Sequence, residues 1–306
     1  MDINWAPLLG ECEQKGSKLI FKGGTTAYQG IPTVSIGNFI TNQSFAGGTI
    51  TAEVQFDNIE DPTGCSIIFY YDSAQSSFVM AGLGRGHLYS INSFYQGRWT
   101  THTFAGDPKN LKPGQKYKLC ISVLGSNVAL KVDGVNVLSF LLPVPLQQSQ
   151  IGLWCCSRSN ITIDNFSVRS EDPRAFIIMQ FTPPYNELYE DVISKICGAE
   201  YKIKAVRPDE IYGPGIILGD IEKQIIESKL IIAEITPANP NVYYELGFAR
   251  ALRKPSILIA EKGTELPFDV SPFRVLFYEN SIPGKKNIEE ALRKHLKAIL
   301  AEGWRF

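Results

Sequence analysis

Histidines and long apolar runs are scarce in this sequence, and their scarcity excludes several classes of protein. The three histidines are His87, His102 and His295, and none lies beside a plausible nucleophile. A catalytic triad and a zinc site therefore have no support in the sequence. No apolar run approaches the roughly 18 residues that a membrane helix needs, and the first residues lack a basic region followed by an apolar core. We expect no membrane span, no signal peptide and a cytoplasmic location.

Cysteine pairs with a ligand spacing and an excess of charge are also missing. The six cysteines are scattered without a C-x-x-C or Cys/His pattern, so we expect reduced, mostly buried thiols and no metal site. The formal net charge is −1, which indicates neither a nucleic-acid-binding nor a membrane-surface protein. The length of 306 residues with 44% hydrophobic residues suggests about two domains with cores of their own.

Residues 1–170 have the pattern of an all-β domain. Apolar residues alternate with polar ones at Ile50, Ala52, Val54 and Phe56, and again in 117–123 and 128–132. This period of two is typical of strands with one buried face. The dipeptide Asp133-Gly134 is a signal for a two-residue hairpin. Many short strands at such spacing predict a β-sandwich.

The stretch 116–168 resembles the concanavalin-A-like (laminin-G-like) jelly-roll sandwiches. The resemblance rests on Tyr117-Lys118-Leu119, Val132-Asp133-Gly134-Val135, Ile151-Gly152-Leu153-Trp154 and Ile163-Asp164-Asn165-Phe166-Ser167-Val168. Such sandwiches often bind glycans or proteins, so the resemblance implies a recognition domain with a glycan or protein ligand, although fold alone does not confer function. The aromatic residues that could form a sugar platform are Tyr70, Tyr71, Tyr89, Phe94, Tyr95 and Trp99. The favoured alternative is that they mostly fill the core and the strand faces.

Residues 173–306 change to alternating strands and helices. Strands are expected at 175–181, 202–206, 230–235, 256–260 and 275–278, and helices at 185–197, 217–228, 242–252 and 288–300. Continuous apolar strands separated by helices predict a parallel sheet that is covered on both faces. The predicted fold class is therefore multidomain: an all-β sandwich followed by a flavodoxin-like, doubly wound α/β domain.

Glu245 is the first candidate site residue. In a helix over 242–252 its carboxylate shares the apolar stripe with Val242, Phe248 and Leu252. A buried ionised group is costly unless it has a partner, and the carboxyl end of a strand is where open α/β sheets bind ligands. The alternative is an acidic residue that only complements the helix dipole. That alternative usually places the residue on the solvent face, so we favour a functional role.

The second half also resembles the bacterial TIR-like / nucleoside 2-deoxyribosyltransferase-like superfamily. The resemblance rests on Phe176-Ile177-Ile178-Met179-Gln180-Phe181, Leu230-Ile231-Ile232-Ala233-Glu234-Ile235-Thr236, Asn239-Pro240-Asn241-Val242-Tyr243-Tyr244-Glu245-Leu246-Gly247-Phe248-Ala249 and Leu266-Pro267-Phe268-Asp269. It implies that Glu245 is the carboxylate that cleaves an N-glycosidic bond. It further implies NAD as substrate without a cofactor, self-association into a homo-oligomer or filament, and a role as a bacterial stress or anti-phage effector.

Two amides keep other functions open. Deoxyribosyltransferases typically carry an Asp at the position of Asn239, and TIR enzymes an aromatic, Ser or Cys at the position of Asn241. Nicotinamide leaves NAD as a neutral molecule, so one carboxylate that stabilises the oxocarbenium-like state suffices, and we favour NAD hydrolysis. The alternatives are a nucleoside or nucleotide N-glycosidase or transferase, and a non-catalytic nucleotide sensor or scaffold.

Further candidate contacts follow from their position at strand ends and helix starts. A substrate is expected to meet them in one crevice with Glu245, where the N-H groups at the helix start near Gly215 could hold a phosphate. The candidates for substrate binding are Gln180, Phe181, Thr182, Tyr185, Arg207, Asp209, Gly215, Asn239, Asn241 and Tyr244.

Overall fold

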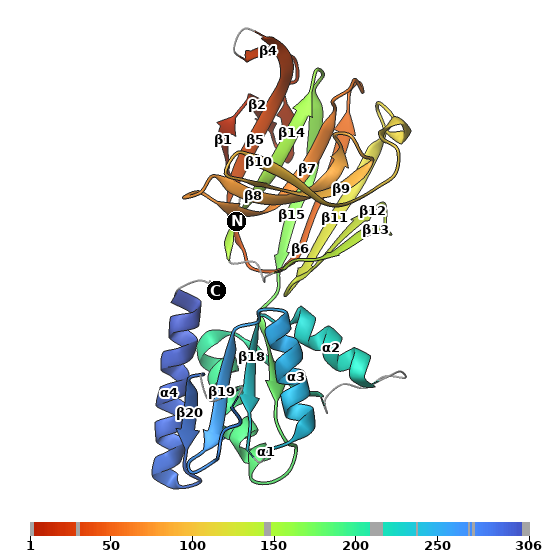
Figure 1. Cartoon of the computed structure of the whole chain (residues 1–306). Coiled ribbons are helices and arrows are strands. Elements are labelled where there is room, and N and C mark those ends of the chain that lie inside the picture. Colours follow the sequence, from red (N-terminus) through yellow and green to blue (C-terminus); the bar gives the residue numbers. More distant parts are fainter. Residues whose placement is uncertain are drawn as a thin grey trace. The chain divides into compact units, whose positions relative to one another are not determined.

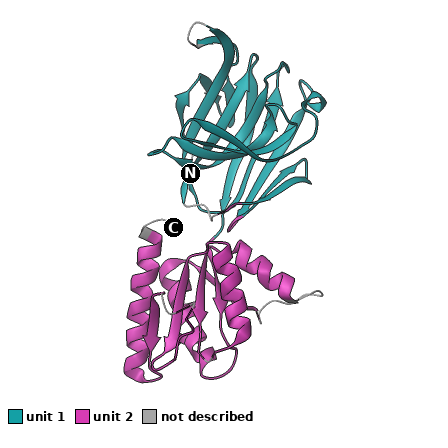
Figure 2. Ribbon diagram, in the orientation of Figure 1, with its two compact units in different colours: residues 1–123, 127–141, 148–171 teal, residues 124–126, 142–147, 172–306 magenta. Residues whose placement is uncertain are grey.

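The chain forms two compact units (Figure 2). The structure is a computed structural model that describes residues 3–28, 31–143, 148–208, 217–236, 238–268, 270 and 273–301. Unit 1 comprises 1–123, 127–141 and 148–171, and unit 2 comprises 172–306 with the short segments 124–126 and 142–147. Each unit has its own sheets and its own core. Within the described residues, no helix is both long and apolar enough to cross a bilayer.

Unit 1 is built from two antiparallel sheets, as Figure 1 shows. The first, sheet A, has the order β1-β5-β14-β7-β8-β9-β10, with β4 paired to β5. Its strands are β1 (Trp5–Leu9), β4 (Thr25–Tyr28), β5 (Ile31–Phe45), β7 (Gly64–Asp72), β8 (Ser77–Gly84), β9 (Tyr89–Tyr95), β10 (Arg98–Ala105) and β14 (Ser149–Ser157).

The second sheet of unit 1, sheet B, has the order β13-β12-β11-β6-β15-β3-β2. Its strands are β2 (Cys12–Lys15), β3 (Lys18–Phe21), β6 (Gly48–Phe56), β11 (Lys116–Leu124), β12 (Asn127–Val132), β13 (Val135–Leu141) and β15 (Ile161–Ser170). A short 3-10 helix, η1 (Pro108–Asn110), precedes β11.

The alternation in the sequence explains the core of the sandwich. In β6, Ile50, Val54 and Phe56 are fully buried, whereas Thr51 and Glu53 between them are only half-buried. Period-two alternation thus turns one face of each strand inward. Asp133 and Gly134 both have positive φ, 51° and 85°, which is what a type I′ turn requires, and they join β12 to β13. The predicted sandwich and its hairpin are confirmed.

A second apolar cluster of unit 1 involves sheet A. It contains Val34, Ile40, Ile68, Phe78, Met80, Trp154 and Cys156, with Tyr71 and Phe94 packed against it. In β14, Trp154 and Cys156 belong to this cluster and alternate with the fully buried Leu153 and Cys155, which therefore face the other way. Sheet A thus carries apolar side chains on both faces, and the face that bears Trp154 is its outer face.

Unit 2 contains a parallel sheet in the order β17-β16-β18-β19-β20. The strands are β16 (Arg174–Ile178), β17 (Lys204–Val206), β18 (Leu230–Glu234), β19 (Ser256–Glu261) and β20 (Val275–Tyr278). All residues of the central strand β18 are buried, as expected for a parallel strand that is covered on both faces.

Helices pack on both faces of the parallel sheet. They are α1 (Tyr185–Leu188), η2 (Tyr189–Ile193), η3 (Ile196–Glu200), α2 (Ile217–Glu227), α3 (Pro240–Ala251) and α4 (Ile282–Ala301). Ile232 of β18 belongs to one core cluster with α1, η2, η3 and α4, whereas Ile231 belongs to the other with α2 and α3. The strand therefore separates two helical layers.

The predicted fold class needs correction. Strands account for 49% of the chain and helices for 22%, so the protein is mainly an antiparallel β protein, and a flavodoxin-like domain is not shown. The predicted helix 185–197 is one short α-turn that continues in the π-helical segments η2 and η3. The prediction overreached because alternating apolar strands and helices indicate a parallel sheet but do not identify one fold among those that contain such a sheet.

Candidate functional site

Glu245 lies on α3, the helix that follows the central strand of unit 2. Val242, Leu246 and Ala249 of the same helix are buried in the core, and Glu245 is half-buried beside them. Burial raises the pKa of its carboxyl to about 7. This raised pKa follows from the loss of hydration of the charged form. The carboxyl can therefore hold or release a proton near neutral pH.

Asn239 and Asn241 have roles at the start of α3. The side chain of Asn239 is the N-cap, and its Oδ1 accepts a hydrogen bond from the backbone N-H of Asn241 at 2.9 Å. Pro240 follows at the first helical position, where its missing N-H costs nothing. The side chain of Asn241 is exposed. The amide at position 239 is explained by helix capping alone.

Tyr244 does not face the same way as Glu245. Its side chain is 48% exposed, and its hydroxyl donates a hydrogen bond to Glu222 Oε1 on α2 at 2.8 Å. The two residues are neighbours in sequence, so they point about 100° apart around the helix. Tyr244 therefore ties α3 to α2, and the structure does not bring it together with the predicted crevice residues.

Arg207 and Phe181 are brought together at the carboxyl ends of β17 and β16. The Arg207 guanidinium lies 5.2 Å from the centroid of the Phe181 ring and 4.3 Å from that of Tyr189. Its Nη1 donates to Asn186 Oδ1 at 3.1 Å, and the residue is buried. Such stacking and hydrogen bonding hold a guanidinium in place. Arg207 is thus fastened to the helical segment after β16.

The remaining described candidates lie just before α1 or at its first residue. The backbone carbonyl of Thr182 accepts from the N-H of Tyr185 at 2.8 Å, which makes it part of the helix start. The side chain of Thr182 is exposed, and Gln180 is half-buried. Burial raises the pKa of Tyr185, and the charges of Glu234 and Glu261 raise it further. Asp209 and Gly215 lie outside the described residues.

Sequence reasoning missed Glu234, which ends the central strand. It is 1% exposed, and both carboxyl oxygens accept from the backbone N-H of Thr236, at 3.1 and 3.0 Å. The Tyr278 hydroxyl lies 3.4 Å from Glu234 Oε1. Burial raises the pKa of Glu234 to about 8, and the Glu261 charge adds to the rise. The repeated Ala-Glu at the ends of β18 and β19 was the signal that could have revealed this pair.

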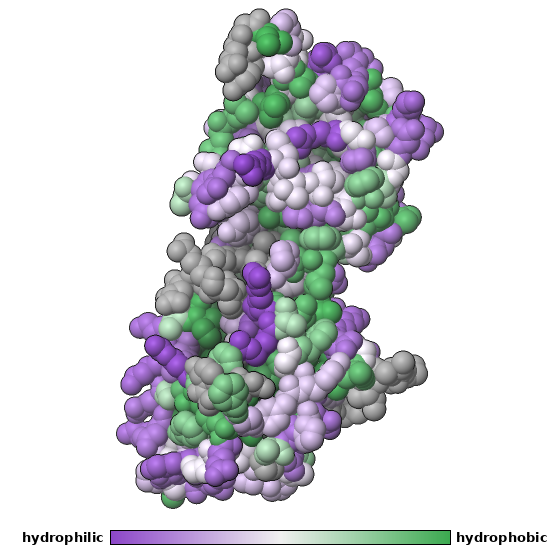
Figure 3. Space-filling model, in the orientation of Figure 1, coloured by the Kyte–Doolittle hydropathy of each residue, from purple (hydrophilic) through white to green (hydrophobic). Residues whose placement is uncertain are grey.

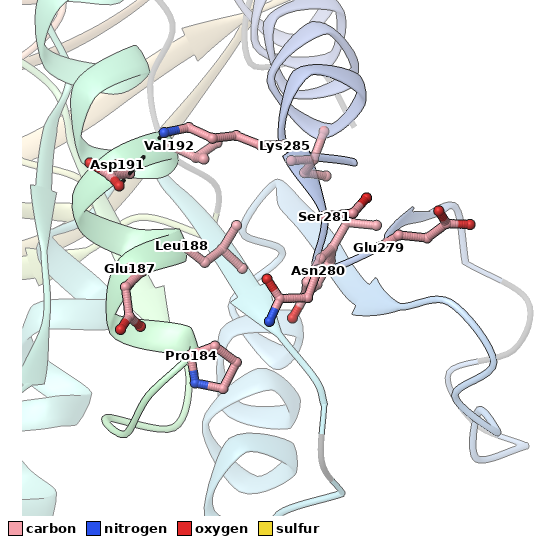
Figure 4. Close-up of a pocket in the computed structure, with 11 residues that line it drawn as sticks. Pro184, Glu187, Leu188, Asp191, Val192, Glu279, Asn280, Ser281 and Lys285 are labelled. Atoms are coloured by element: carbon pink, nitrogen blue, oxygen red, sulfur yellow. Dashed lines mark ion pairs between the residues drawn. The ribbon is translucent and has the colours of Figure 1, made fainter. Parts of the chain in front are cut away.

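A cavity of about 330 Å³ lies on the α1 and α4 side of the sheet (Figure 4). Leu188 and Val192 line it from one side and Lys285 from the other, as Figure 4 shows. Tyr278, the last residue of β20, is also part of the lining. Its lining includes none of the residues that the sequence analysis selected. The described residues hold no group of three or more His, Cys, Asp or Glu side chains arranged for a metal ion.

The outer face of sheet A carries an aromatic cluster, which we call the aromatic face. Phe78 pairs with Phe94 across β8 and β9, and Phe94 pairs with Trp99 across β9 and β10. Residues directly opposite in an antiparallel pair share a face. The ring centroids of Phe94 and Trp99 are 5.0 Å apart, and those of Trp99 and Trp154 are 5.6 Å apart. Trp154 is buried, whereas Trp99 is 38% exposed.

Polar groups stand beside these rings. The amide of Asn92 donates to Ser90 Oγ at 2.7 Å and accepts from Thr101 Oγ1 at 2.8 Å. Asn92 pairs with Met80, and Met80 belongs to the same apolar cluster as Trp154, so this network is on the aromatic face. Figure 3 shows hydrophobic side chains reaching the surface of unit 1 among polar ones. Such mixing of rings and polar groups is typical of ligand sites.

Arg85 covers the two indoles of the aromatic face. Its guanidinium carbon lies 3.6 Å from the centroid of the Trp99 ring and 4.9 Å from that of Trp154. Burial lowers the pKa of this guanidinium. The sequence analysis named Phe94 and Trp99 as platform candidates but not Arg85 or Trp154. Only the pairing of the five strands β14, β7, β8, β9 and β10 reveals that these residues meet.

Sheet B has an open groove of about 970 Å³. Its aromatic side chains are Trp5 and Phe166, whose ring centroids are 4.9 Å apart in an edge-to-face arrangement. Lys118 and Glu53 add opposite charges, and Thr51 and Ser167 share a hydrogen bond of 2.8 Å. This groove is a second surface of unit 1 that carries aromatic side chains. A substitution in it can therefore serve as a control for a substitution on the aromatic face.

Comparison with known proteins finds similarity only at the level of solved structures. No family model matches the chain, and no curated protein matches it. A carbohydrate-binding module, CBM66 from Bacillus subtilis, is 13% identical, with 53% of this chain and 92% of that chain covered and a TM-score of 0.45. A β-glucanase from Bacillus licheniformis is 11% identical, with 54% and 92% covered and a TM-score of 0.36. A Bacillus subtilis protein with a galectin-like fold is 12% identical, with 53% and 96% covered and a TM-score of 0.36.

These findings correct the predicted family and function. The structural matches are β-sandwich proteins over about half of the chain, and the comparisons give no match to a TIR-like or deoxyribosyltransferase protein. The predicted NAD hydrolysis is therefore wrong, and its nucleoside and nucleotide-sensing alternatives and the TIR-type filament are not supported. The motif around Glu245 led to a wrong family assignment. Its residues are also those expected of any helix with an N-cap that follows a buried strand. The concanavalin-A-like sandwich is the part of the prediction that fits.

Proposed function

We propose that unit 1 recognises glycans through the aromatic face of sheet A. The observation that carries this proposal is Trp99, an exposed indole held in place by Phe78, Phe94 and Trp154. An exposed ring that is fixed by its neighbours loses little conformational entropy when a ligand stacks on it. A sugar ring offers apolar C-H groups for such stacking and hydroxyls for the polar groups beside it.

The polar groups fit a ligand that both donates and accepts hydrogen bonds. Thr101 is exposed, and its Oγ1 retains capacity for a second hydrogen bond after it donates to Asn92. Hydroxyl-rich ligands meet such mixed donors and acceptors better than purely apolar ligands do.

Trp99→Ala is expected to weaken glycan binding. We expect the affinity for a glycan identified on an immobilised glycan array to fall by roughly tenfold or more, because the stacking surface is removed while the strand pairing stays intact. Titration calorimetry with that glycan measures the change. Trp5→Ala, which removes the half-buried indole of the sheet B groove, is the matched control and should leave the affinity unchanged.

Two results would count against the aromatic face. Undiminished binding by Trp99→Ala shows that the ring does not contact the sugar. Loss of binding in Trp5→Ala instead assigns the glycan to the groove of sheet B. Near-UV circular dichroism of both variants verifies that the sandwich retains its packing, so a loss of affinity is not a loss of fold.

A second candidate function is the hydrolysis of a glycosidic bond in such a glycan by unit 2. The observation that favours it is Glu245, a half-buried carboxyl with a pKa of about 7 beside the central strand. A carboxyl that is protonated near neutral pH can donate its proton to the leaving oxygen of a glycosidic bond. Glu245 is then the general acid of unit 2. Its proton goes to the leaving oxygen as the bond from that oxygen to the anomeric carbon breaks, and a water molecule adds to the anomeric carbon and releases a proton to solvent.

Glu245→Gln is expected to abolish release of reducing ends from the bound glycan. The amide keeps the shape of the side chain but cannot donate a proton as an acid, and loss of general acid catalysis costs about 10²- to 10⁴-fold in rate. A reducing-end assay on the full chain measures it. Glu222→Gln on α2 is the matched control and should remain active. Equal rates for Glu245→Gln and wild type would remove Glu245 from the chemistry.

A further inference from the structure

Arg85 occupies an unusual position on the aromatic face. It follows β8 with a positive φ of 62°, and its guanidinium stacks over Trp99 and near Trp154. The backbone N-H of Arg85 donates to the carbonyl of Thr63 at 2.9 Å, which fixes the start of the side chain. In the part of the chain that the structure describes, no hydrogen bond or ion pair of the guanidinium to an acceptor is found.

A half-buried guanidinium without an acceptor is costly. Its five N-H donors lose part of their hydration, and stacking on the indole faces replaces only the attraction across the ring plane. The donors in the plane of the guanidinium remain available at its edge. A ligand that brings an anionic group to that edge would accept hydrogen bonds from these N-H donors and neutralise the positive charge of the guanidinium.

We propose that Arg85 selects acidic glycans by pairing with the carboxylate of a uronic acid or of a similar acidic sugar. This inference rests on the proposed function and names the ligand class of the same face. A carboxylate presents two oxygens in a plane, and the planar fork of an arginine matches them with two parallel hydrogen bonds. The exposed part of the adjacent Trp99 then contacts the ring of the sugar that carries the acid.

The surroundings add positive charge to this end of the face. Burial raises the pKa of the Cys156 thiol, and the positive charges of Arg85 and Arg158 lower it. Burial has the larger effect, so the pKa of the thiol is about 11. The charge of Asp61 opposes these positive charges at the same thiol. Arg158 Nη1 donates to the backbone carbonyl of Asp61 at 2.7 Å, so it is held in place. The two guanidinium groups carry more positive charge than the single carboxylate of Asp61 cancels. The local electrostatic potential is therefore positive and attracts an anion.

The stacking prepares the guanidinium for binding. Arginine loses rotamer freedom when it becomes fixed, and the two indoles impose this cost before any ligand arrives. A lysine at this position would keep the charge but present a point charge without the planar fork. Arg85→Lys and Arg85→Met therefore separate the contribution of charge from the contribution of geometry.

The experiment compares two probes that differ only in the acidic group. Oligogalacturonate carries a carboxylate where oligogalactose of the same linkage carries a hydroxymethyl group. Titration of the full chain is expected to give an affinity for the acidic probe at least roughly tenfold higher, and this preference should weaken as salt is raised. Arg85→Met should lose the preference, and Arg85→Lys should keep only part of it. Arg98→Met, which removes an exposed arginine of β10, is the control and should keep it.

The outcomes separate this inference from the proposed function. Binding of the neutral probe as tightly as the acidic one, or an unchanged preference in Arg85→Met, overturns the role of Arg85 while glycan recognition stands. Failure of both probes and of an array of other acidic and neutral glycans to bind the wild-type chain overturns both. Thermal unfolding of each variant shows whether its sandwich is intact, and Arg85→Lys retains the stack should Arg85→Met unfold.

Discussion

Glu234→Gln is expected to remove the larger part of the loss of stability that unit 2 undergoes between about pH 5 and pH 8. A smaller loss should remain, because burial also raises the pKa of Glu245 to about 7. In the folded chain the pKa of Glu234 is raised to about 8, from an ordinary value of 4.5, because the carboxyl is buried at the end of β18. Between these two values the folded state holds a proton that the unfolded state has released. Stability therefore falls as pH rises through this window, and the decrease is complete above the folded pKa.

The expected size of this effect is a few kcal/mol, because each pKa unit corresponds to about 1.4 kcal/mol. Glutamine imitates the protonated acid without titrating, and its amide oxygen can accept from the N-H of Thr236 as the carboxyl does. Urea unfolding at a series of pH values, followed by the circular dichroism of the helices, measures the slope for unit 2, because α1 to α4 all lie there.

Glu261→Gln is the matched control for this experiment. Glu261 ends the neighbouring strand β19 with the same Ala-Glu dipeptide, but it is only half-buried. We expect this variant to keep most of the pH dependence. If the Glu234→Gln protein loses stability between pH 5 and pH 8 as steeply as the wild type does, the carboxyl of Glu234 is not the protonated group.

The parts of the fold that could be predicted from the sequence are those that local patterns determine. The alternation of Ile50, Ala52, Val54 and Phe56 specifies a strand with one buried face, and Asp133-Gly134 specifies its hairpin turn. Likewise, a helix follows the central strand as predicted, although it begins at Pro240 after the N-cap Asn239 and not at residue 242. Each of these features depends on neighbours within a few residues, so the sequence alone suffices.

The aromatic face could not be predicted, because it depends on strand register. Arg85, Trp99 and Trp154 are far apart in sequence, and they meet only because β14, β7, β8, β9 and β10 are adjacent in sheet A. A shift of register by one residue would turn each of these side chains to the other face. Aromatic composition therefore indicates candidates but does not show which of them share a surface.

Glu234 was missed for a different reason. A continuous apolar run such as Leu230 to Ala233 predicts a buried strand, and an acid at its end is usually the first solvent-exposed residue. Here the carboxyl is buried near Tyr278 and accepts a hydrogen bond from the backbone N-H of Thr236. Burial at a strand end is decided by the loops and helices that cover it, and the strand's own sequence does not contain that information.

Lys254→Met is the second change with a large expected effect, and its sign is opposite to that of Glu234→Gln. Lys254 is 4% exposed, and its ammonium donates to the backbone carbonyls of Ile226 and Ser228 at 2.6 and 2.7 Å. Burial lowers its pKa to about 7 from an ordinary 10.5, and the charge of Lys229 lowers it further. Between these values the unfolded state binds the additional proton, so stability rises with pH.

Methionine fills a similar volume but cannot titrate, so Lys254→Met should lose most of this rise, which amounts to a few kcal/mol between about pH 7 and pH 10. A smaller rise should remain, because burial lowers the pKa of Lys229 to about 8. The variant also leaves two carbonyls at the end of α2 without their donor, so its deficit against the wild type should be largest at high pH. Urea unfolding from pH 6 to pH 10 measures both the lost rise of stability with pH and the deficit of the variant at high pH. Lys297→Met, on the exposed side of α4, is the control, and an identical pH profile for Lys254→Met and wild type would show that Lys254 remains charged throughout.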